Sequence, residues 1–341
     1  MVTDRYRWLT IALVGVLCVS SEALHGWGER GHLLVNRLAV QALPDDGPVF
    51  LRSHEEWIAQ TGPVPDTWRQ PADPFLKIIE DPNHHWYKEA LSFLKEIPRS
   101  RYEFVVAMYR EFLKVGDSPN GERLLLPNVF AGTLPYEATE IYERLKAGMR
   151  VYRMQEARNP RTRYYPDTRF TENDLAFYME WLGHYIGDGS QPLHVTIHGD
   201  GWKGPNPNGY ATDRIHIRFE TEYLELIGIS ADDVRPLVGP ARVVSDPFDA
   251  VLAHLDRSAA RVEELYRLEK AGAFKDASNT GAKNLVATQL AAAAQLLRDL
   301  VYTAWVESAK PLPSVTPSTD PLDRANSRFN PATGSAPAPS P

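Results

Sequence analysis

Apolar residues along most of the chain recur at intervals of three or four positions, which is the spacing of one face of a helix. A helix beginning at 171 is further indicated by Thr-Glu-Asn-Asp, which resembles a capping box. The predicted helices cover residues around 33–38 and the ranges 102–113, 136–154, 171–185, 248–270 and 282–309. Alternating apolar and polar runs long enough for a sheet are not found, so the sequence predicts an all-α fold.

The two ends of the chain differ from this pattern. Arg5 and Arg7 precede an apolar run too short to span a bilayer, which is typical of a secretory signal cut after Ala23 or Gly26. From about Pro311 the residues are Pro, Ser, Thr and Ala with little to bury. We therefore expect a signal peptide over 1–26, one domain over 27–310, a disordered tail over 311–341, and a secreted or periplasmic protein.

The net charge and the cysteine content exclude several classes of site and partner. Lys and Arg number 37 against 44 Asp and Glu, a net charge of −7, so no bulk positive field attracts nucleic acid or anionic lipid. The one cysteine, Cys18, lies in the predicted signal. Without thiols, the mature chain is expected to lack disulfides, thiolate nucleophiles and cysteine zinc sites.

Histidines and carboxylates gather in one short part of the sequence. His184 and Asp188 are four residues apart on a predicted helix, His216 and Glu220 repeat this spacing, and His194 lies between the pairs. Side chains at this spacing share a helix face. A single such pair is more often a surface ion pair, but two pairs with a further histidine favour a metal site, and imidazole with carboxylate suits zinc.

The string from His184 to His194, His-Tyr-Ile-Gly-Asp-Gly-Ser-Gln-Pro-Leu-His, closely resembles the signature of the zinc-dependent nuclease and phospholipase C superfamily. This superfamily includes fungal single-strand-specific nucleases, plant bifunctional nucleases and bacterial phosphatidylcholine-hydrolysing phospholipase C. The resemblance implies an all-helical enzyme that holds three zinc ions in a cleft. Further matches to its pattern are Trp27-Gly-Glu-Arg-Gly-His32, Asp66-Thr-Trp-Arg69 and Pro82-Asn-His84-His85-Trp86.

Residue by residue, the resemblance implies a ligand set for each zinc ion. Our own hypothesis adds a catalytic role for Asp66, which we expect to orient or deprotonate the attacking water. The first ion is assigned to Asp66, His84 or His85, His184 and Asp188. The second is assigned to His194, His216 and Glu220, and the third to Trp27, His32 and a bridging Asp188. Cleavage after Ala23 would leave Trp27 without the free amine that the family uses.

The sequence carries features of more than one substrate class. Arg161, Arg163 and Tyr164 belong to a basic run with interleaved aromatics, which suits single-stranded nucleic acid, although such a run can also be a solvated loop. Glu220 stands where family nucleases have Asp and phospholipases have Glu. We expect a monomeric single-strand-specific endonuclease with 3′-nucleotidase activity releasing 5′-nucleotides from DNA or RNA. The alternatives are a phospholipase C acting on a phospholipid head group and a non-catalytic secreted zinc-binding protein.

Three histidines of the predicted domain, 27–310, fall outside the proposed ligand set. His54 and His254 are isolated on polar or amphipathic stretches, so both are expected at or near the surface. His198 lies four residues after His194 and is expected in an exposed loop, with a role next to the zinc ligands as the alternative.

Overall fold

The computed structural model describes residues 27–116, 130–157 and 167–338. These residues are mainly helical and contain no strand, which confirms the all-α prediction; Asn330 and Ser335 form an isolated β-bridge. Among the described helices, none combines the length and the apolar character needed to cross a membrane. The predicted signal peptide, 1–26, lies outside the described residues.

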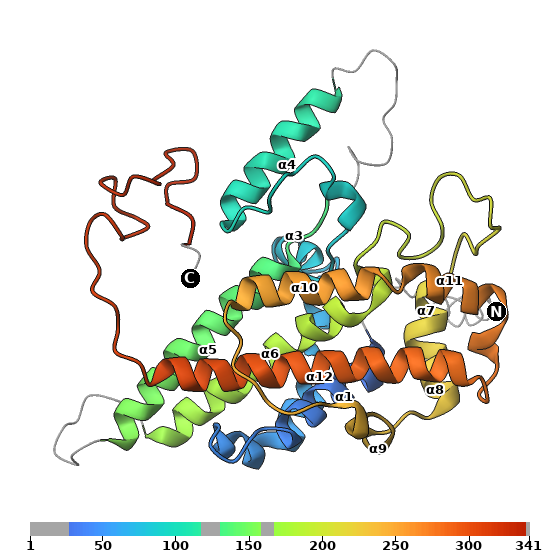
Figure 1. The fold of residues 1–341 in the computed structure, drawn as a ribbon, viewed down its shortest axis with the longest axis horizontal. Helices are drawn as coiled ribbons and strands as arrows, with labels where there is room; N and C mark the ends of the chain where they lie inside the picture. The colour runs from blue at the N-terminus through green and yellow to red at the C-terminus, as the bar shows by residue number, and fades with distance from the viewer. Residues whose placement is uncertain (1–26, 117–129, 158–166, 339–341) are drawn as a thin grey trace, which may run out of the picture.

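Four long helices form the centre of the molecule (Figure 1). They are α1 (Gly28–Gln41), α5 (Leu134–Glu156), α6 (Thr168–Ser190) and α12 (Thr280–Ser308). Helix α6 packs against the other three, and buried residues such as Leu38, Ile141 and Leu297 form the shared core. Because α6 is central, the side chains on its inner face lie at the middle of the fold.

Shorter elements surround this centre. They are η1 (Val49–His54), α2 (Glu55–Thr61), η2 (Val64–Arg69), α3 (Pro74–Asn83), η3 (Lys88–Leu91), α4 (Arg101–Gly116), η5 (Pro192–His194), α7 (Ile215–Ile217), η6 (Arg218–Glu222), α8 (Tyr223–Ile227), α9 (Ala231–Val234), η7 (Arg235–Leu237), α10 (Pro247–Ala259), α11 (Val262–Lys270) and η8 (Ala273–Lys275).

Two helix boundaries differ from the sequence prediction. The stretch 248–270 is not one helix, because α10 ends at Ala259 and the Arg261 amide donates to the Ser258 carbonyl at 2.9 Å before α11 begins. Helix α6 begins earlier than expected, at Thr168, because the Asp167 side chain accepts a hydrogen bond from the Arg169 amide and caps it. Thr171 is a buried residue inside the helix.

The apolar stripe of α4 is only partly buried. Phe104 packs in the core, whereas Val105, Tyr109 and Phe112 are exposed. Figure 1 shows α4 standing away from the central helices. The sequence spacing correctly predicted a helix, but the face that it predicted for the core finds few partners among the described residues.

The C-terminal residues 309–338 follow α12 as an irregular chain with turns and the isolated bridge. Most of these residues are exposed, and these include the apolar Leu312, Val315 and Leu322. The rest of the predicted tail, 339–341, lies outside the described residues.

Candidate metal centre

Three groups of buried side chains present nitrogen or carboxylate oxygen atoms within 4.8 Å of one another, as a metal ion requires. They come from α1, η2, the end of α3, α6, η5, α7 and η6, with His84 directly after the last residue of α3, so the fold brings distant parts of the sequence together. The groups are His32, Asp66 and His184; His84, His184 and Asp188; and His194, His216 and Glu220. The residue types and the burial support metal binding, and the first two groups share His184.

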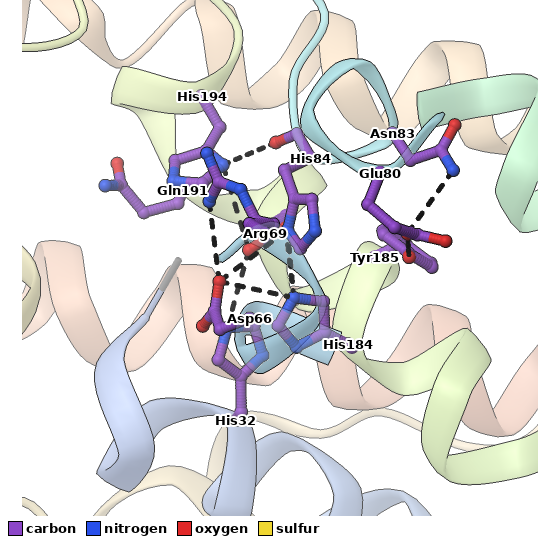
Figure 2. Close-up of polar contacts among 12 residues, drawn as sticks. His32, Asp66, Arg69, Glu80, Asn83, His84, His184, Tyr185, Gln191 and His194 are labelled. Carbon is purple, nitrogen blue, oxygen red and sulfur yellow. Dashed lines mark hydrogen bonds and ion pairs between the residues drawn. The ribbon is translucent and has the colours of Figure 1, made fainter. Parts of the chain in front are cut away.

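The first two groups meet at the inner face of α6. Asp188 Oδ2 lies 2.9 Å from His84 Nδ1 and 3.4 Å from His184 Nε2, its neighbour one turn earlier. Asp66 Oδ1 lies 3.7 Å from His84 Nδ1 and 3.8 Å from His184 Nε2. Figure 2 shows Asp66, His84 and His184 converging on one point, with His32 approaching from α1.

His32 completes this part of the site. Its ring stacks on His184 with centroids 4.0 Å apart, and its Nε2 lies 3.4 Å from Asp188 Oδ1. Asp188 therefore faces His84 and His184 with one oxygen and His32 with the other. Such an arrangement allows one carboxylate to bridge two metal ions.

The last group combines η5 with the turn formed by α7 and η6. His216 Nε2 lies 3.1 Å from His194 Nε2 and 2.8 Å from Glu220 Oε2. Gln191 links the two elements, because its amide nitrogen donates to Glu220 Oε2 at 3.2 Å and its oxygen accepts from the Leu193 amide at 2.7 Å. Gln191 therefore fixes Glu220 relative to η5.

Backbone carbonyls set the orientation of three imidazoles. The Nδ1 atoms of His184, His194 and His216 donate to the carbonyl oxygens of Gly62, His84 and Gly199 at 2.9, 2.5 and 3.0 Å. Because a carbonyl only accepts, each Nδ1 carries a proton and each Nε2 of the neutral ring presents a lone pair to the centre. This is the tautomer that metal ligation through Nε2 requires.

The atom separations agree with those of ligands around one metal ion. Two nitrogen ligands of one tetrahedral zinc, with bonds of about 2.0–2.1 Å, lie about 3.3 Å apart. The Nε2 atoms of His194 and His216 are 3.1 Å apart, and His184 Nε2 is 3.1 Å from His84 Nδ1. Facing lone pairs at this distance repel each other unless a proton or a cation lies between them.

Unpartnered polar atoms point to the same conclusion. Both ring nitrogens of His32, Nε2 of His84 and Oδ1 of Asp188 are buried without a hydrogen bond. Leaving a buried polar atom unpaired costs about 1–3 kcal/mol. A bound cation would satisfy the Asp188 oxygen and one nitrogen of His32, so the residues present fit the metal centre that the sequence suggested.

Burial also disturbs protonation throughout the site. It raises the pKa of Asp188 well above its ordinary value and lowers the pKa of His32 to about 4. Burial raises the pKa of Glu220 to about 8; it opposes protonation of His216, but the Glu220 carboxylate outweighs it and raises the His216 pKa. The His216–Glu220 pair therefore retains a proton near neutral pH, which a metal ion has to displace.

Glycines on α6 allow α1 to approach the centre. A Cβ on Gly187 would stand 3.0 Å from His32 Nδ1, and a Cβ on Gly183 would stand 1.7 Å from the side-chain oxygen of Asn36. The absence of side chains at these two positions lets His32 lie against His184 and Asp188.

The remaining predicted site residues fall in different places. His84 lies within the ligand groups, whereas His85 Nε2 donates to the Phe130 carbonyl at 3.1 Å and its ring stacks on Tyr87. The Trp27 side chain is buried and donates to Ser190 Oγ at 2.7 Å; the residues before it are not described. Arg161, Arg163 and Tyr164 lie outside the described residues.

The histidines outside the ligand set also have defined positions. His254 is buried, contrary to the surface prediction, and its Nε2 donates to the Ile186 carbonyl at 3.1 Å. His54 is partly exposed, as expected. His198 is partly exposed and stacks on Trp202 with centroids 4.1 Å apart.

Sequence reasoning missed a polar layer behind the first group. Tyr185 donates a 2.5 Å hydrogen bond to buried Glu80, and its ring packs edge-on against His84 and His184 (Figure 2). Arg69, noted only as part of a sequence match, contacts Asp66 at 3.5 Å and Asp81 at 3.0 Å. The position of Tyr185 directly after His184 in the sequence could have predicted its role. No sequence feature pointed to Glu80.

No protein-family model matches the chain, and no curated protein matches it.

Proposed function

We propose that this protein is an exported zinc-dependent phosphodiesterase, a single-strand-specific endonuclease with 3′-nucleotidase activity that releases 5′-nucleotides from DNA or RNA. The observation that carries the proposal is the convergence of five histidines and three carboxylates, all buried, on one centre. Imidazole and carboxylate donors without thiolate suit zinc. Three bound zinc ions would supply Lewis-acid polarisation of a phosphate and positive charge that a chain of net charge −7 otherwise lacks.

Asp66 is the candidate proton acceptor. It is 6% exposed, and it lines a cavity of about 360 Å³ together with Glu29, Gln60 and Gln70. Asp66 thus belongs both to a ligand group and to the wall of a cavity that a substrate can enter. In this position it orients the attacking water and accepts a proton from it.

Arg69 is the candidate phosphate contact. Burial alone would lower its pKa, but Asp66, Asp81 and Asp188 raise the pKa above its ordinary value, so the guanidinium stays charged. Its bond to Asp81 fixes the side chain beside Asp66. A fixed guanidinium next to the proton acceptor stabilises negative charge on the phosphate oxygens during cleavage.

The proposal is tested by chelator-reversible release of acid-soluble nucleotides from single-stranded DNA, with metal content and the N-terminal residue determined on the same sample. About three zinc ions per chain, Trp27 as the first residue, and cleavage are expected. Bound zinc without hydrolysis of DNA, RNA or phospholipid would establish the non-catalytic alternative instead.

One observation favours a phospholipase C as the second candidate. Helix α3, which ends beside the ligand His84, exposes Phe75, Ile78 and Ile79 at 88, 73 and 58%. An exposed apolar helix face suits contact with a lipid surface. Hydrolysis of phosphatidylcholine vesicles in preference to DNA would identify this function.

A further inference from the structure

Partly exposed aromatic side chains from two elements form a cluster beside the metal centre. Trp68 of η2 meets Trp181 of α6 edge to face, with ring centroids 5.7 Å apart and an interplanar angle of 82°. Phe177, one turn before Trp181, lies 5.6 Å from it, and the Arg144 guanidinium of α5 lies 5.6 Å from the centre of the Trp181 ring. These four residues are called the aromatic surface below.

The aromatic surface is continuous with the candidate metal centre. Trp68 stands between Asp66 and Arg69 in the sequence. Trp181 donates from Nε1 to the Tyr185 hydroxyl at 3.3 Å, and the Tyr185 ring contacts the rings of His84 and His184 at 5.2 and 5.3 Å. Buried Tyr185 thus connects the aromatic surface to the ligand groups through the core, and Trp68 stands two residues from Asp66, which lines a cavity at the site.

The chemistry of the surface fits single-stranded nucleic acid. Arg144 is exposed, stacks on Trp181 and acts electrostatically on Glu140 one turn away, so its guanidinium is held at the surface where a phosphate can reach it. Aromatic rings stack on unpaired bases regardless of sequence. The exposed face of α3 differs, since it carries aliphatic residues and one phenylalanine.

We propose that Trp68, Phe177, Trp181 and Arg144 form the surface on which unpaired bases of a single-stranded nucleic acid stack as the strand enters the metal centre, with Arg144 contacting its backbone phosphate. This inference rests on the proposed nuclease function. It adds the path of the strand outside the metal centre and explains how an acidic protein can hold a polyanion.

The test measures binding of a fluorescein-labelled oligothymidylate to the zinc-loaded full chain by anisotropy, in an Asp66→Asn background that prevents cleavage. Trp68→Ala and Phe177→Ala are each expected to weaken binding roughly 5- to 100-fold, the range for loss of one base–aromatic stack. Arg144→Gln is expected to lower the slope of log affinity against log salt by about one. Trp57→Ala is the matched control, because Trp57 is 45% exposed on α2 outside the cluster.

A second readout separates this inference from the proposed function and from misfolding. Hydrolysis of bis(p-nitrophenyl) phosphate, which offers no strand to stack, should be chelator-sensitive in the native chain and unchanged by Trp57→Ala. Trp68→Phe should restore the oligonucleotide binding that Trp68→Ala loses. Binding within twofold of the Trp57→Ala control overturns the aromatic surface while leaving the nuclease intact. Absence of chelator-sensitive hydrolysis overturns the nuclease function, and capture of phosphatidylcholine vesicles by the surface in place of the oligonucleotide overturns both.

Discussion

The side-chain oxygen of Asn36 on α1 occupies the space that a Cβ on Gly183 of α6 would need, since the two would be 1.7 Å apart. Asn36 is fully buried and held by a hydrogen bond from its amide nitrogen to the Ile58 carbonyl at 3.1 Å. The two helices therefore meet at a fixed separation one turn from His32 and next to His184, and the geometry of the metal centre depends on that contact.

Gly183→Ala is expected to destabilise the fold by about 1–3 kcal/mol, the usual cost of overpacking a core. Because α1 has to move away, zinc affinity should fall as well. Urea unfolding and competition with a zinc-binding dye measure the two effects. Gly281→Ala is the control, because an added Cβ there meets its nearest atoms at 3.4 Å and should leave both quantities unchanged.

Gln191→Ala is expected to weaken zinc binding about 10- to 100-fold, as loss of a bond that orients a metal ligand commonly does. The substitution removes the hydrogen bond to Glu220 and the side-chain cap on the Leu193 amide, but no ligand. Dye competition and zinc content after dialysis measure the effect. Gln60→Ala, which removes a surface amide bonded to Glu56, is the comparison; equal affinities in the two variants would contradict the role of Gln191.

The sequence could predict those parts of the site whose residues are neighbours along the chain. His184 with Asp188, and His216 with Glu220, are each one helical turn apart, so their spacing alone brought each pair together. The sequence could not decide which of His84 and His85 is the ligand. That choice depends on the direction in which the chain leaves α3, and that is fixed by distant contacts such as the Trp86 amide donating to the His194 carbonyl at 2.9 Å.

Tertiary contacts also decided the features that the sequence misplaced. The break after Ala259 has no glycine or proline to mark it, so periodicity continued through it. His254 stands in an amphipathic stretch, and only the packing of α10 against α6 buries its ring. Helix α4 shows the opposite case, in which residues that were expected to be buried are exposed. A helical pattern predicts the helix but not which other element covers its apolar face.

His254 should make stability depend on pH. Burial lowers its pKa to about 4 in the fold, against about 6.5 when unfolded, so the unfolded chain binds more protons between these values. Stability is therefore lost as pH falls through this window, by about 2 kcal/mol at pH 5.

His254→Gln keeps a nitrogen donor for the Ile186 carbonyl but cannot titrate. Urea unfolding at pH 7.5 and pH 5 should show a loss of stability smaller by about 2 kcal/mol in this variant than in the native chain. Contributions from the other histidines cancel in that difference. The partly exposed His54, changed to Gln, is the control, and an identical loss in all three proteins would show that His254 does not titrate as its burial implies.

Asp66→Asn separates proton transfer from metal binding, because asparagine keeps one side-chain oxygen but cannot accept the proton of the attacking water. Turnover of single-stranded DNA is expected to fall by about 10²–10⁴, the contribution of a positioned general base. Most of the zinc should remain bound, since the other members of all three groups are intact. Asp73→Asn, on the surface at the start of α3, is the matched control. Full activity in the Asp66 variant would exclude the role of proton acceptor. Loss of activity together with loss of one zinc ion would show that Asp66 acts mainly as a metal ligand.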